Sequence, residues 1–89
     1  MIRKEGLALE YADDELVIVE KQSGQVHQLN STATLVWRGL DEELAVGEIA
    51  AKLADRFDVD LKTAEVDVAE IISQLREVSL LTAEESETT

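Results

Sequence analysis

The spacing of apolar residues changes at Asn30 and divides the chain into two halves. Before Asn30 the apolar residues alternate with polar ones or form a short β-branched run, and both patterns are typical of strands. After Asn30 they recur at steps of three and four residues, which is the pattern of amphipathic helices. The sequence therefore predicts an α+β fold in which a sheet is followed by helices.

Three strands are predicted in the first half. Residues 7–11 alternate, residues 16–19 form a β-branched run typical of a well-buried strand, and residues 25–29 form a short polar strand. An acidic pair at 13–14 marks the first turn, and Gly24 supplies the positive φ that a tight hairpin often needs at the second. We therefore expect a three-stranded antiparallel meander.

Three helices are predicted in the second half. The first begins at a capping side chain, Asn30 or Ser31, which accepts a hydrogen bond from a free amide. The second covers 46–57, and the third follows a cap at Asp60 and runs for about five turns to Val78. The apolar stripes consist of Ala33, Val36, Trp37, Leu40 and Leu44 in the first helix, Val46, Ile49, Ala50, Leu53, Ala54 and Phe57 in the second, and Leu61, Ala64, Val68, Ile71, Ile72, Leu75 and Val78 in the third.

Length and composition fit one domain. The chain has 89 residues, of which 45% are hydrophobic, and this is enough for one modest core without a metal or a disulfide. We expect the domain to span residues 1–82. Residues 83–89 have no periodicity and carry three glutamates, so we expect them to form a disordered acidic tail.

The residue types argue against catalysis and against a bound cofactor. The absence of cysteine excludes disulfides, thiol nucleophiles and zinc–thiolate sites, and one histidine excludes a multi-histidine metal centre. No carboxylate cluster has the spacing of an EF-hand, and the glycines are too isolated for a phosphate loop. No serine or cysteine is placed to be a nucleophile beside His27, which we interpret as a surface residue. We predict no enzyme, no cofactor and no metal site.

The charge of the chain limits its partners. Twenty acidic and eight basic residues give a formal net charge of -12, which repels nucleic acid and anionic lipid. The acidity serves solubility or attracts a basic peptide, and both interpretations stay open. Without a signal peptide or an apolar run long enough to span a membrane, we expect a cytoplasmic protein with no membrane partner.

Strands followed by three helices suggest a winged helix-turn-helix, in which the third helix would enter the DNA major groove. In that helix Lys62 and Arg76 are outnumbered by four acidic residues, which is the wrong sign for DNA. An acidic winged-helix transcription regulator is therefore the alternative function.

The polar third strand also has two interpretations. Polar residues protect an exposed edge from aggregation, or the edge recruits an extended peptide as a further strand. An unpaired edge also allows a weak homodimer through this strand.

The order and spacing of several short motifs resemble the PqqD-like family. These motifs are Gly24, V-H-Q-L-N ending at Asn30, Ala33 with Val36-Trp37, E-I-A-A-K-L from Glu48, F-D-V-D from Phe57, and D-V from Asp67 leading to L-R-E-V-S-L-L. The family includes the peptide chaperone of pyrroloquinoline quinone biosynthesis and the RiPP recognition elements, which bind ribosomally made, post-translationally modified peptides. The resemblance covers roughly residues 7 to 81.

The resemblance implies a winged-helix-like peptide chaperone of natural product biosynthesis. Such a protein binds the leader segment of a precursor as a strand added to the third strand, in the groove between that strand and the third helix. It does no chemistry itself and presents the precursor to a modifying enzyme such as a radical-SAM protein, a cyclase or a protease. The peptide-binding residues implied are Gln25, Val26, His27, Gln28 and Leu29 on the strand and Ala64, Asp67, Val68 and Ile71 on the helix, with Val66 and Glu70 at the margins.

Overall fold

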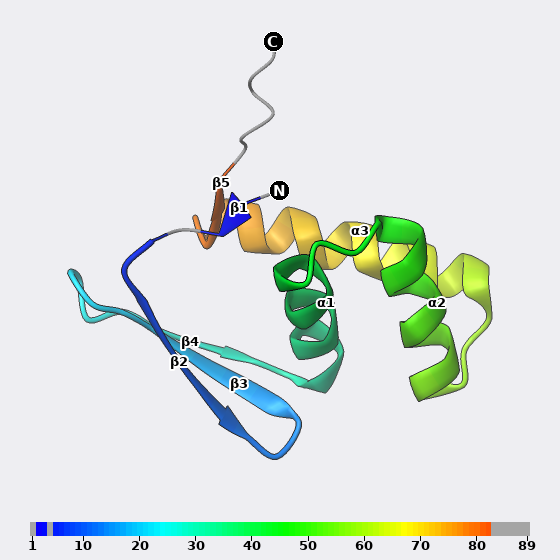
Figure 1. Cartoon of the computed structure of the whole chain (residues 1–89), viewed down its shortest axis with the longest axis horizontal. Helices are drawn as coiled ribbons and strands as arrows, with labels where there is room; N and C mark the ends of the chain where they lie inside the picture. The colour runs from blue at the N-terminus through cyan, green and yellow to red at the C-terminus, as the bar shows by residue number, and fades with distance from the viewer. Residues whose placement is uncertain (1, 4, 83–89) are drawn as a thin grey trace, which may run out of the picture.

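The computed structural model of the chain describes residues 2–3 and 5–82 (Figure 1). The predicted acidic tail, 83–89, lies outside the described residues. In chain order the elements are β1 (Ile2–Arg3), β2 (Leu7–Ala12), β3 (Glu15–Glu20), β4 (Val26–Leu29), α1 (Ser31–Asp41), α2 (Val46–Phe57), α3 (Leu61–Glu77) and β5 (Leu81–Thr82).

The strands β2, β3 and β4 form one antiparallel sheet with β3 in the middle. In this sheet Ile18 pairs with Leu9 on one side and with His27 on the other. This is the predicted meander, and together with the three helices that follow it confirms the α+β fold. Among the described strands β4 pairs with β3 alone, so β4 is an edge strand.

The helices lie on one side of this sheet (Figure 1). On β3 the side chains of Leu16 and Ile18 are fully buried in the core, whereas Val17 and Val19 point to the other face and are only partly buried. The prediction of a strand at 16–19 is confirmed, but the prediction that the whole run is well buried is wrong. Strand side chains alternate between two faces, and helices cover one of them.

Side-chain caps fix the start of α1 and α3. The Asn30 carboxamide oxygen accepts a hydrogen bond from the Ala33 N–H at 2.9 Å, so Asn30 is the cap and Ser31 is the first helical residue. The Asp60 carboxylate accepts from the Thr63 N–H at 2.7 Å. This main-chain hydrogen bond, together with one to the Thr63 side chain, lowers the pKa of Asp60 below its ordinary range.

The core lies where the three helices meet the sheet. Trp37 is its largest side chain and is 1% exposed. The helices α1 and α2 approach closely at Gly39, where an added Cβ would lie 2.6 Å from the Ile49 Cγ1. A side chain at this crossing would collide with Ile49 of α2 unless the two helices shift.

A second, two-stranded sheet joins the two ends of the described chain. In it β1 pairs antiparallel with β5, with Ile2 opposite Thr82 and Arg3 opposite Leu81. Figure 1 places this pair beside the C-terminal end of α3. The sequence did not predict it, since two residues are too few to carry a periodic pattern.

Candidate functional site

The free edge of β4 presents main-chain groups that the sheet does not use. The Glu20 N–H donates to the Gln25 carbonyl at 2.8 Å, so this carbonyl points toward β3. Along a strand, the main-chain N–H and C=O groups of successive residues point to opposite sides. The N–H and C=O groups of Val26 and of Gln28 therefore point away from β3. Within residues 2–3 and 5–82 no other segment forms hydrogen bonds with these four groups. They form a template on which another extended chain can pair.

The side chains of β4 divide between the two faces of the sheet. Val26, which is 60% exposed, and Gln28 lie on the outer face. His27 and Leu29 lie on the inner face, opposite Ile18 and Leu16 of β3. Gln25 is exposed and precedes β4, so the strand is one residue shorter than predicted.

His27 forms a pair with Glu20 on the inner face. The His27 Nε2 and the Glu20 Oε2 are 2.7 Å apart, and each side chain is 11% exposed. The interpretation of His27 as a surface residue is therefore wrong. Strand alternation puts His27 on the same face as the buried Leu29, and this signal was present in the sequence.

The predicted residues of α3 fall into two groups. Ala64 and Val68 are fully buried and belong to the core, whereas Asp67 and Ile71 on the flank of the helix keep part of their surface exposed. The two positions predicted at the margins are the most open: Val66 is 53% exposed and Glu70 is also exposed.

The helix that packs most closely against β4 is α1. The Thr34 hydroxyl, which is buried, donates to the Leu29 carbonyl at 3.2 Å and ties α1 to the end of β4. Helix α3 contacts α1, α2 and β5. The groove between β4 and α3 stays a prediction.

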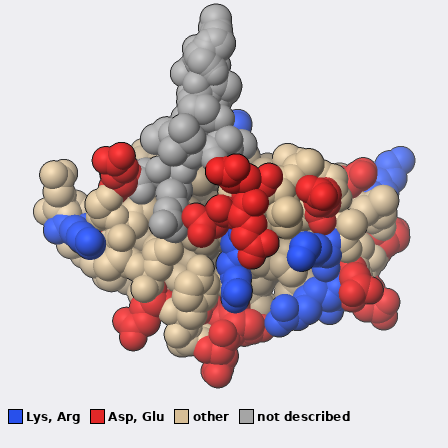
Figure 2. Space-filling view, viewed as in Figure 1, with Lys and Arg blue, Asp and Glu red and all other residues tan. Residues whose placement is uncertain are grey.

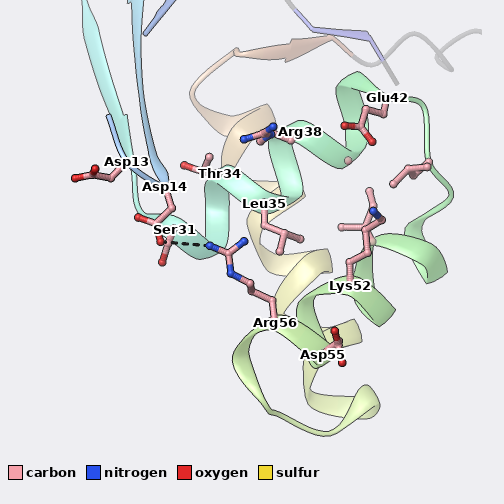
Figure 3. A pocket seen from close by; sticks show the side chains of 13 residues that line it. Asp13, Asp14, Ser31, Thr34, Leu35, Arg38, Glu42, Lys52, Asp55 and Arg56 are labelled. Atoms are coloured by element: carbon pink, nitrogen blue, oxygen red, sulfur yellow. Dashed lines mark ion pairs between the residues drawn. The ribbon is translucent and has the colours of Figure 1, made fainter. Parts of the chain in front are cut away.

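The structure also contains a pocket that the sequence did not predict. It has a volume of about 490 Å³ and lies between the β2–β3 turn, α1 and α2 (Figure 3). Its charged side chains include Arg38 from α1 and Lys52 and Arg56 from α2. The β2–β3 turn, α1 and α2 are separate in the sequence, and no pattern within any one of them indicates that they form a pocket together.

The described part of the chain lacks two further kinds of feature. It contains no group of three or more His, Asp or Glu side chains placed to hold a metal ion. It also contains no helix that is both long and apolar enough to cross a membrane.

The sequence matches the family described as Coenzyme PQQ synthesis protein D (PqqD) over residues 15–81. This range runs from the start of β3 through all three helices. The chain belongs to the PqqD family.

Two solved structures are similar to this PqqD-family chain over nearly its whole length. One is TbiB1 in complex with the TbiA(beta) leader peptide; it is 25% identical, has a TM-score of 0.83, and the match covers 93% of this chain and 96% of that chain. The other is lasso peptide synthetase B1 complexed with the leader peptide, at 25% identity, a TM-score of 0.81 and coverage of 90% and 94%. A comparison with curated protein sequences gives no significant match.

Proposed function

We propose that this PqqD-family chain is a RiPP recognition element, which binds the leader segment of a ribosomally synthesised precursor and presents it to a modifying enzyme. The observation that carries the proposal is the edge of β4, where four main-chain groups of Val26 and Gln28 face outward. An extended peptide that pairs with them becomes a fourth strand of the sheet. The two similar structures, each in complex with a leader peptide, support a leader peptide as the ligand.

Main-chain pairing supplies affinity, and side chains supply selection. Alternate side chains of the added strand would lie on the inner face, beside His27 and Leu29. We propose that they reach the flank of α3 formed by Asp67 and Ile71, with Val66 and Glu70 at its margins. Ala64 and Val68 then support this surface from beneath, since both are fully buried.

The chain itself is proposed to be non-catalytic. The one histidine of β4, His27, pairs with Glu20, and this pairing holds the imidazole but provides no nucleophile. The chemistry would belong to the partner enzyme, a radical-SAM protein, a cyclase or a protease.

Charge favours a leader with basic residues. The chain carries a formal net charge of -12, and Glu65, Asp67 and Glu70 place carboxylates along the exposed part of α3. Such a field speeds the encounter with a cationic peptide and is screened by salt. Affinity for a basic leader should therefore be lower at high ionic strength than at low ionic strength.

Isothermal titration calorimetry tests the proposal directly. The purified chain would be titrated with synthetic leader peptides of precursors encoded near its gene, with a scrambled peptide of the same composition as the control. We expect saturable binding of one peptide per chain for a true leader and much weaker binding of the scrambled peptide. Equal binding of the two would refute sequence-selective recognition.

A further inference from the structure

The pocket between the β2–β3 turn, α1 and α2 is separate from the proposed peptide edge. None of the residues that line it belongs to β4 or to α3. Peptide and pocket ligand could therefore be held at the same time. The two places are nevertheless joined, because the Thr34 hydroxyl, which lines the pocket, donates to the Leu29 carbonyl at the end of β4.

The pocket gathers an unusual share of the basic residues of this acidic chain. Arg38, Lys52 and Arg56 are three of its eight lysines and arginines. Figure 2 shows basic side chains over α1 and α2 on one face of the molecule, bordered by acidic ones. Four carboxylates also line the pocket, which makes it a poor site for a polyanion such as nucleic acid.

The basic groups of the pocket are available to a new partner. The Arg56 guanidinium lies 3.7 Å from the Asp14 carboxylate, but both side chains are more than half exposed, so this pair is weak. The Arg38 guanidinium lies 5.2 Å from the centre of the Tyr11 ring and is held in place without being neutralised. Within the described residues Lys52 forms no ion pair.

Part of the pocket lining between these charges is apolar. It includes Leu35 of α1, which is partly exposed and labelled in Figure 3. The fully buried Ile49 of α2 also belongs to this lining. Gly39 adds no side chain and lets the two helices approach closely. A volume of about 490 Å³ accommodates one or two protein side chains.

We propose that this pocket is the docking site for the modifying enzyme, and that it receives an apolar side chain of that enzyme flanked by a carboxylate. The apolar group covers the exposed part of Leu35, and the carboxylate pairs with Lys52 and Arg56. Acidic residues at the rim, such as Asp13 and Asp55, pair with basic groups around the docked segment. The inference rests on the proposed function, because it assumes an enzyme that receives the bound precursor.

Charge reversal at the pocket tests the proposal in the reconstituted reaction. The variants Lys52→Glu and Arg56→Glu should each raise the KM of the modifying enzyme for the chain–precursor complex about tenfold, since attraction becomes repulsion at the contact. Leader affinity should stay within about twofold of wild type, because neither residue lies near the β4 edge. The matched control is Lys62→Glu on α3, which makes the same change of charge outside the pocket and should change neither value.

The outcomes separate the two proposals. An unchanged KM in both pocket variants, with leader affinity intact, overturns the docking site and leaves the proposed function standing. If the wild-type chain binds no leader, the proposed function itself fails. Loss of leader affinity in the pocket variants, with KM unchanged once the leader is saturating, would also overturn the docking site.

A second measurement needs only the chain. The probes are the capped dipeptides N-acetyl-leucyl-glutamate amide and N-acetyl-leucyl-lysine amide, followed through the backbone amide shifts of the labelled protein. The glutamate probe should give saturable shifts at Leu35, Ile49 and Lys52, and these shifts should disappear in the Lys52→Glu variant. The lysine probe should give no saturable shifts at these residues. Equal responses to both probes, or none to either, would count against the proposal.

Discussion

Replacing Gln28 by proline removes one outward main-chain donor of β4 and leaves the sheet bonded. The N–H of Gln28 points to the free edge, because the register places His27 and Leu29 in the pairs that bond to β3. Proline is tolerated on edge strands where the missing N–H would face solvent. The variant should therefore fold and lose only the bond that the proposed peptide would accept there.

The size of the effect follows from one hydrogen bond. A net hydrogen bond contributes about 0.5–1.5 kcal/mol, which corresponds to an affinity loss of about twofold to thirteenfold. The proline ring also projects toward the incoming strand, so the loss should lie at the upper end of this range. Calorimetric titration with the leader peptide measures it, after circular dichroism and an NMR spectrum have established that the variant is folded.

The control is Gln28→Ala, which keeps the N–H and removes a side chain on the outer face. Its affinity should stay within about twofold of wild type, because that side chain faces solvent. A folded Gln28→Pro variant with wild-type affinity would refute strand addition at this edge. Leader peptides N-methylated at alternate residues test the same bond from the other side, and only one of the two alternations should weaken binding.

Three further changes test the account of the fold. Trp37→Ala should lower the free energy of unfolding by about 3–5 kcal/mol, because the side chain is fully enclosed; a urea midpoint near that of wild type would contradict this. Gly39→Ala should destabilise by about 1–3 kcal/mol through collision with Ile49, although alanine is the better helix former by about 1 kcal/mol; a stabilised variant would mean that the helices move apart easily. Because the pKa of Asp60 is lowered in the folded state, its charge stabilises the fold above the ordinary aspartate pKa, and this contribution is lost as pH falls through the lowered pKa. In the Asp60→Ala variant the free energy of unfolding should therefore decrease less as the pH is lowered, which urea unfolding between about pH 2 and 7 measures.

The order of the elements could be predicted because each carries its own local signal. The change of apolar spacing at Asn30 separates strands from helices, and the capping side chains of Asn30 and Asp60 mark where α1 and α3 begin. These signals depend on neighbours within a few residues, so they can be recognised without knowledge of the fold.

Features formed by distant segments could not be predicted in this way. The pairing of β1 with β5 joins opposite ends of the described chain through two residues each. The pocket depends on Asp14, Arg38 and Arg56, which lie in the β2–β3 turn, α1 and α2. Contacts of this kind are set by tertiary packing and have no local pattern.

The candidate site could be predicted from the sequence only in part. The edge of β4 was predicted from the polarity of the strand, and strand alternation also carries the signal for the inward side chain of His27. The pairing of His27 with Glu20 of the neighbouring strand has no such local signal. On α3 the sequence could not separate core from flank, because Ala64 and Val68 share one apolar stripe with Ile71. The structure makes this separation, with the first two fully buried and the third partly exposed.

The most direct test of the central claim is an NMR titration of the isotope-labelled chain with its leader peptide. Strand addition predicts saturable amide shifts concentrated at Val26–Leu29, strongest at Val26 and Gln28, with a second group at Asp67 and Ile71 of α3. Hydrogen exchange of the Val26 and Gln28 amides should slow in the same complex, because each would then donate to the peptide. Saturable binding with shifts confined to another surface, such as β2, and no new protection at Val26 or Gln28 would contradict the account.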